Sequence, residues 1–134
     1  MIKVLGIEHI GIALKDNKQL SNIFKYLFDL SYIGSEVIVE QGVKTEIFDV
    51  VNTKIELLES ISEDSPINKY ISKRGEGMHH IALIVKDIDS AINYLLQKNI
   101  SMIDSKPKIG VEGYQIAFIH PKSTPGLLIE LCQK

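Results

Sequence analysis

The chain has 134 residues, of which 45% are hydrophobic and 24% are charged, and its formal net charge is −2. This composition is typical of a globular domain with a sizeable core, and the balance of charge argues against a broad nucleic-acid surface. The single cysteine, Cys132, excludes an internal disulfide and an all-cysteine zinc site. No apolar run reaches the ~18 residues of a membrane span and no secretory leader is evident, so we expect a cytoplasmic protein that does not enter membranes.

The first part of the chain predicts a strand, a helix and three more strands. The stretch HIGIALKD, residues 9–16, is apolar between its histidine and its final Lys-Asp. Residues 17–30 carry apolar side chains at helical spacing, behind an aspartate that is suited to cap a helix. Three β-rich runs follow, separated by turn signals, at residues 32–40, 44–51 and 53–60.

The second part repeats this order after a connecting segment, residues 62–77, in which Pro66 behind Asp64 and Ser65 predicts the start of a short helix. The stretch HIALIVKD, residues 80–87, repeats the pattern of a histidine, an apolar run and Lys-Asp. A helical spacing follows at residues 88–100, behind Asp87, which is suited to cap the helix. Further β-rich runs at residues 100–105, 114–121 and 126–133 are separated by turn signals at 106–110 and 123–126.

We therefore predict an α+β fold in one domain, residues 1–134. It would consist of two βαβββ modules, at about residues 1–61 and 78–134 and joined by the segment at about 62–77, that form a cleft-shaped mixed β-sheet with helices outside.

The repeat places four candidate metal ligands at matched positions. His9 aligns with His80, rather than with His79, because both precede their Lys-Asp by six residues. Glu56 and Glu130 each stand in the frame Ile-Glu-Leu on the last strand of their half. Two modules related by a pseudo-twofold axis would bring the four side chains together.

Imidazole and carboxylate groups suit a divalent first-row metal ion such as Mn, Co, Ni or Zn. Two interpretations without a metal stay open. A histidine on a strand is often a hydrogen-bonded core residue, and Glu56 would be solvated if its strand were half exposed. Since neighbouring side chains on a strand point to opposite faces, we expect His79 to be a core or supporting group rather than a ligand.

The βαβββ repeat with its His…Glu…His…Glu pattern resembles the vicinal oxygen chelate superfamily, which includes glyoxalases, bleomycin resistance proteins and dioxygenases. Within it, stretches such as IEHIGIALKD, TKIELLE, GEGMHHIALIVKDI and AFIHPKST resemble the methylmalonyl-coenzyme A epimerases over nearly the whole chain. The resemblance implies a homodimer and an acyl-CoA substrate. It also implies a divalent metal ion with four protein ligands: His9, Glu56, His80 and Glu130.

The implied reaction interconverts (2R)- and (2S)-methylmalonyl-CoA by 1,1-proton transfer through a metal-stabilised enolate. The resemblance assigns one proton-transfer role to Glu130. For the other, some relatives carry a glutamate two residues after the QGV triplet, where this chain has Thr45. The next residue, Glu46, should face away from the site by strand alternation unless a bulge turns it inward, so the second acid/base stays unassigned.

Several side chains near the end of the chain are candidates for contact with coenzyme A or for shaping the cleft: Lys106, Lys108, His120, Lys122 and Ser123. Two other functions remain as alternatives. One is a glyoxalase I-like isomerase acting on a glutathione-type hemithioacetal. The other is a non-catalytic module that binds a small molecule, although retention of all four ligand-type residues argues against it.

Overall fold

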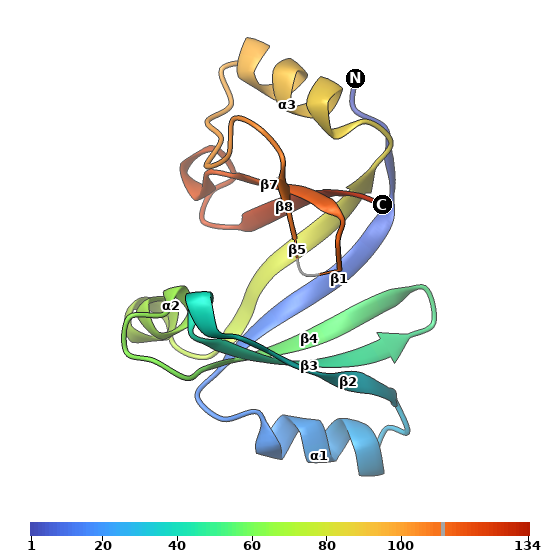
Figure 1. Cartoon of the computed structure of the whole chain (residues 1–134), viewed down its shortest axis with the longest axis vertical. Helices are drawn as coiled ribbons and strands as arrows, with labels where there is room; N and C mark the ends of the chain where they lie inside the picture. Colours follow the sequence, from blue (N-terminus) through green and yellow to red (C-terminus); the bar gives the residue numbers. More distant parts are fainter. Residues whose placement is uncertain (111) are drawn as a thin grey trace. The chain divides into compact units, whose positions relative to one another are not determined.

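The computed structural model describes residues 1–110 and 112–134, which contain eight strands, three α-helices and two short 3-10 helices (Figure 1). In chain order they are β1 (Val4–Leu14), α1 (Lys18–Tyr26), β2 (Ser31–Ile38), η1 (Val39–Gln41), β3 (Val43–Val50), β4 (Thr53–Ser60), α2 (Pro66–Arg74), β5 (Gly77–Val85), α3 (Ile88–Gln97), β6 (Lys108–Ile109), β7 (Gln115–Ile119), η2 (Pro121–Ser123) and β8 (Leu128–Gln133). The strands make a mixed sheet, and the predicted α+β fold of two βαβββ modules is confirmed.

The chain divides into two compact units, residues 9–79 and residues 1–8 with 80–134. In the 9–79 unit the strand order is β2-β3-β4-β1, with β1 parallel to β4 and the other pairs antiparallel. Helix α1 packs on one face through a core of Phe24, Phe48 and Leu57. The opposite face contributes Ala13, Val43 and Leu58 to a second core with Ile67 and Ile71 of α2.

In the unit of residues 1–8 and 80–134 the strand order is β5-β8-β7-β6, and β5 runs parallel to β8. Helix α3 covers β7 and β8, as Figure 1 shows. Its buried Ile88 and Ile92 pack against Val85, Ala117 and Leu131. In each unit one face of the sheet packs against α1 or α3, and the opposite face carries a candidate His–Glu pair. In the 9–79 unit α2 also packs on that opposite face.

The caps predicted for α2 and α3 are confirmed. The cap predicted for α1 is partly wrong, because the Asp16 carboxylate accepts the Lys18 amide at 2.8 Å but Asp16 precedes the N-cap position. The Ser65 hydroxyl accepts a hydrogen bond from the Asn68 amide at 3.0 Å at the start of α2, and Asp87 caps α3. At α1 the N-cap residue is Asn17, whose side chain makes no capping bond. Asn17 is buried, and its Nδ2 instead donates to the Leu57 carbonyl at 3.1 Å, a bond that ties the helix to β4.

The predicted strand at residues 100–105 is also wrong, because this segment makes only one isolated bridge, between Met102 and Ile119. The Asp104 carboxylate accepts a hydrogen bond from the Phe118 amide at 2.9 Å. In a regular strand pair this amide would instead bond to a backbone carbonyl of the neighbouring strand. The short β6 lies instead at Lys108–Ile109, inside the expected turn. No helix among the described residues is both long and apolar enough to cross a membrane.

Candidate functional site

The first candidate pair, His9 and Glu56, lies in the 9–79 unit on the face opposite α1. In the parallel pairing of β1 with β4, Gly11 stands beside Glu56, so His9 is the diagonal neighbour of the carboxylate on the same face. His9 Nε2 is 3.5 Å from Glu56 Oε2, and the side chains are only 10% and 16% exposed. Because Gly11 has no side chain, nothing on β1 stands directly beside the carboxylate.

The second pair, His80 and Glu130, repeats this geometry in the other unit. In the pairing of β5 with β8, Ala82 stands beside Glu130, and His80 precedes Ala82 by two residues, as His9 precedes Gly11. His80 Nε2 is 3.4 Å from Glu130 Oε2, with both side chains buried, and the His80 ring packs edge-on against Phe118. The sequence repeat is therefore also a repeat of one His–Glu arrangement.

The chemistry of each pair fits a divalent metal ion. Separations of 3.4 and 3.5 Å exceed the ~2.7–2.9 Å of a charge-assisted hydrogen bond between nitrogen and carboxylate. Two donors that are each ~2.1 Å from one ion would lie roughly 3.0–3.4 Å apart at octahedral or tetrahedral angles. Both pairs are shielded from water. An ionised carboxylate in such buried surroundings needs a cationic partner. Each His–Glu pair is thus suited to supply two ligands.

His79 and Cys132 are close in sequence to the predicted ligands but are not among them. His79 packs edge-on against Tyr70, with ring centroids 4.8 Å apart, and burial lowers the pKa of the imidazole. Burial, together with the negative charge of Glu130, raises the pKa of the Cys132 thiol to about 12. The free thiol therefore stays protonated at neutral pH.

The two residues considered for the second acid/base lie on opposite faces of β3. The pairing of β3 with β4 is continuous from Val43 to Val50, without a bulge. Thr45 stands opposite Leu58 and is buried on the face that carries Glu56. Glu46 stands opposite Leu57, and its carboxylate accepts a hydrogen bond from the Ser21 hydroxyl of α1 at 3.4 Å. Regular alternation is therefore kept along β3, and Glu46 faces the helix rather than Glu56.

Most of the candidate coenzyme A contacts have structural partners. His120 Nδ1 accepts the Lys122 amide at 3.1 Å, and the Ser123 hydroxyl accepts the Ser101 amide at 2.9 Å, so both side chains hold the turn before β8. Lys108 pairs with Asp104 at 3.3 Å. The ammonium groups of Lys106 and Lys122 form no ion pair within the described part of the chain, and these two residues remain candidates.

One ion pair of a buried carboxylate was not predicted from the sequence. The Glu8 carboxylate is 4% exposed and lies 2.8 Å from Lys134 Nζ. The ion pair links β1 to the residue after β8. The sequence does contain an indication of this ion pair, because Glu8 precedes His9 in an otherwise apolar strand. A charged side chain is buried in such a strand only when it has a partner.

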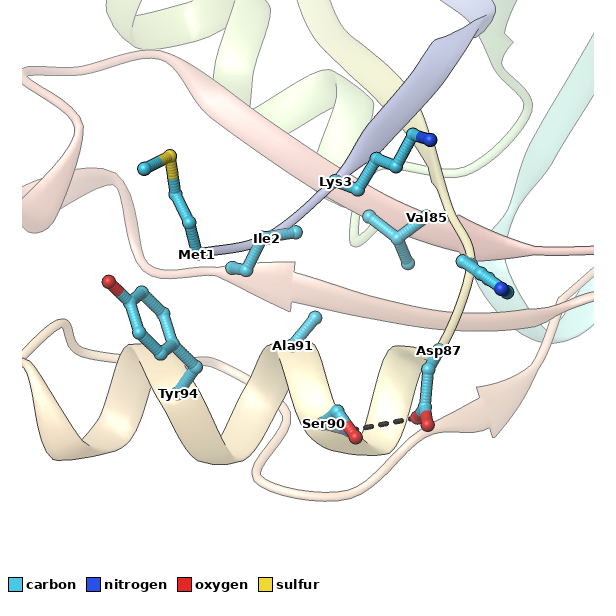
Figure 2. A pocket seen from close by; sticks show the side chains of 9 residues that line it. Met1, Ile2, Lys3, Val85, Asp87, Ser90, Ala91 and Tyr94 are labelled. Atoms are coloured by element: carbon cyan, nitrogen blue, oxygen red, sulfur yellow. Dashed lines mark hydrogen bonds between the residues drawn. The ribbon is translucent and has the colours of Figure 1, made fainter.

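A pocket of about 270 Å³ lies elsewhere, between the first residues of the chain and α3 (Figure 2). Its apolar lining includes Ile2, Val85 and Ala91, and Figure 2 shows the hydrogen bond between Asp87 and Ser90 at its edge. None of the four predicted ligands lines this pocket, so it is separate from the candidate site.

Comparison with known proteins places these observations in a family. The pattern of the Glyoxalase/Bleomycin resistance protein/Dioxygenase superfamily matches residues 8–118. A mitochondrial methylmalonyl-CoA epimerase of Dictyostelium discoideum is 39% identical, over 96% of this chain and 78% of that protein. A hypothetical protein from Bacillus halodurans has a similar structure, with a TM-score of 0.90 and 43% identity over 96% of this chain and 93% of that one. A methylmalonyl-CoA epimerase solved with methylmalonyl-CoA and NH4+ gives a TM-score of 0.88 and 32% identity, over 98% and 96% of the two chains.

Proposed function

The chain belongs to the glyoxalase/bleomycin resistance protein/dioxygenase superfamily and, within it, to the methylmalonyl-CoA epimerases, and on this premise we propose that it interconverts the (2R) and (2S) epimers of methylmalonyl-CoA. The observation that carries the proposal is the buried His–Glu pair that each half of the chain presents in the same arrangement. Such pairs supply the ligands and the carboxylate base that this chemistry requires.

We propose further that one divalent ion is held jointly by His9, Glu56, His80 and Glu130. The nitrogen and oxygen donors of these side chains favour Co, Mn, Ni or Zn. When bound, such an ion would act as a Lewis acid toward the negative charge that develops on the thioester oxygen. The two carboxylates would neutralise the charge of the ion in a water-poor setting.

The reacting hydrogen is on C2 of the acyl group, between the thioester and the free carboxylate. In the proposed reaction the Glu130 carboxylate removes this proton from one face. The electron pair of the C–H bond moves into the C1–C2 bond as the π pair of the thioester C=O bond moves onto its oxygen. Return of a proton to the opposite face inverts C2, and the reverse sequence uses the same groups in exchanged roles. Burial of Glu130 beside His80 limits its rotamers, which holds the carboxylate in place.

Three further features are part of the proposal. Lys106 and Lys122 would contact the phosphates of the coenzyme A moiety. The protein would be a homodimer, in line with the apolar side chains of Leu27, Phe28 and Ile33, which are more than half exposed in the single chain. Cytoplasmic location stays a prediction, which fractionation of the source cells tests.

A direct test is to incubate Co²⁺-loaded protein with (2S)-methylmalonyl-CoA in D₂O and to follow the C2 hydrogen and the epimer ratio. We expect deuterium at C2 and a mixture of epimers, both abolished by chelator. The hemithioacetal of glutathione and methylglyoxal serves as the competing substrate. Turnover of that compound without exchange in methylmalonyl-CoA would favour the glyoxalase I-like isomerase. Binding without turnover of either compound would favour a non-catalytic module.

A further inference from the structure

The proposed epimerisation lacks one of its two acid/base groups. A 1,1-proton transfer needs a group on each face of C2, and Glu130 serves one face. Thr45 lies on the face of Glu56, but a threonine hydroxyl is far too weak an acid and base for this step. Glu46 has the right group but faces α1. The second group must therefore come from another strand.

Strand β2 contains an irregularity that sequence alternation does not reveal. Tyr32 pairs with Phe48, yet Gly34 pairs with Ile47, so Ile33 is an extra residue in β2. Such a bulge reverses the faces of all later side chains in the strand relative to those before it. The Tyr32 ring packs against Phe48 on the α1 side. Without the bulge, the side chain of Glu36 would point to that side as well.

Because of the bulge, Glu36 stands directly opposite Thr45 on the face that carries Glu56. Side chains of directly opposed residues in an antiparallel pair have Cβ atoms ~4.5–5.5 Å apart. On this face Leu58, Thr45 and Glu36 stand side by side across β4, β3 and β2. The neighbouring set of side-by-side residues on the same three strands is Glu56, Ile47 and Gly34. Glu36 therefore carries its carboxylate beside the position of Thr45 and on the same face, where some relatives have a glutamate from β3 itself.

The surroundings of Glu36 leave its carboxylate free to react. The side chain is exposed, and no hydrogen bond or ion pair involves it within the described residues. Asp49 is the carboxylate of β3 on this face, and in the pairing of β3 with β4 it stands opposite the cationic Lys54. Glu36 instead has the neutral Thr45 as its cross-strand neighbour on β3. The opposed position therefore offers no cation to form an ion pair with the Glu36 carboxylate.

We propose, as an inference that rests on the proposed function, that Glu36 is the second acid/base group of the epimerase and replaces the glutamate that some relatives carry at the position of Thr45. In one direction Glu130 takes the C2 proton, the C–H electron pair moves into the C1–C2 bond, and the thioester π pair moves onto oxygen. The protonated Glu36 then gives its proton to the opposite face of C2, and the C=O bond re-forms. In the other direction Glu36 takes the proton and Glu130 gives one. Exchange of protons with water returns each carboxyl group to its starting state.

The test is the fate of the C2 hydrogen of each epimer in D₂O with the Glu36→Gln variant. For the epimer that presents its hydrogen to Glu36, we expect exchange to fall by a factor of ~10² or more. The other epimer should still exchange through Glu130 but without inversion. Affinity for Co²⁺, measured calorimetrically, should be unchanged because Glu36 is not a ligand. Glu40→Gln, which removes the same charge from the neighbouring η1, is the matched control and should behave as wild type.

A rescue experiment separates a chemical role from a structural one. Thr45→Glu in the Glu36→Gln background restores a carboxylate one strand away and should recover inversion, whereas Thr45→Gln in that background should not. The proposal is overturned if the Glu36→Gln variant exchanges the C2 hydrogen of both epimers at equal rates. It is also overturned if exchange is lost for one epimer in the Asp49→Asn variant but not in the Glu36→Gln variant. If wild-type protein itself shows no exchange, the proposed function fails instead, so the two failures are distinguishable.

Discussion

Adjacent histidines on β5 allow the metal proposal to be tested with two variants that differ by one position. His80 is buried 3.4 Å from Glu130, whereas His79 lies on the other face of the strand against Tyr70. His80→Ala removes a proposed ligand, whereas His79→Ala removes a side chain that packs against Tyr70 and is not a proposed ligand. We expect added metal to stabilise the wild-type and His79→Ala proteins and to leave the His80→Ala protein unchanged.

The expected shifts follow from mass action. A ligand present at 100 times its Kd adds about 2.7 kcal/mol to the free energy of unfolding. For a chain of this length 1 kcal/mol changes Tm by roughly 3–5 °C, so Tm should rise by about 8–13 °C. The aromatic pair of His79 and Tyr70 is worth about 0.5–1.5 kcal/mol. Loss of this contact should lower the Tm of metal-free His79→Ala by about 2–7 °C but leave the metal-dependent rise intact.

The assay is thermal unfolding followed by circular dichroism, with chelator-treated protein titrated with Co²⁺ and its Kd taken from calorimetry. His9→Ala, the equivalent change in the other half of the repeat, should behave like His80→Ala. The assignment of ligands is refuted if His80→Ala keeps the full metal-dependent rise while His79→Ala loses it. Absence of any rise in wild-type protein at saturating Co²⁺ would refute a preformed metal site.

Three other predictions concern single residues. Glu130→Gln should retain part of the Co²⁺ affinity but lower the rate of epimerisation ~10²-fold or more. It should also suppress C2 exchange for the epimer that Glu36→Gln does not affect. Near-normal turnover would mean that Glu130 is a metal ligand only. Val51→Gly should raise the free energy of unfolding in urea by ~0.5–1 kcal/mol, because Val51 has a φ of 57° in the β3–β4 turn; a decrease would contradict this explanation. Hydrogen bonds from Ser90 lower the pKa of Asp87 from its ordinary 3.8, so this stabilising contribution is present above pH ~4 and disappears as pH falls through the lower value in the folded protein. The Tm difference between wild type and Asp87→Ala should therefore shrink below pH ~4, and a difference that is constant with pH would contradict this.

Local patterns in the sequence were sufficient for the fold and for the identity of both His–Glu pairs. The paired histidines, the Lys-Asp ends and the helical spacings recur in one order, and the β-α-β-β-β modules follow from them. The capping residues Ser65 and Asp87 were also readable, because a cap bonds to amides only two or three positions along the chain. The caps join groups that are close in sequence, whereas the His–Glu pairs were readable because the same pattern occurs twice in the chain.

Contacts between distant segments decided the remaining features. Asn17 gives its side chain to the carbonyl of Leu57 instead of capping α1, and Asp104 takes the Phe118 amide and prevents a strand. Both outcomes depend on which strand lies alongside, and the sequence around Asn17 or Asp104 does not contain that information.

The side chain faces of β2 show the same limit most clearly. Counting by twos from Tyr32 puts Glu36 on the helix side, whereas the extra Ile33 puts it opposite Thr45. Alternation is a local property of an extended chain, but a bulge is a property of two paired strands, since it exists only where one strand has a residue that the other does not match. The sequence therefore determined which residue types carry the chemistry, and the pairing of β2 with β3 determined that Glu36 shares a face with Glu56.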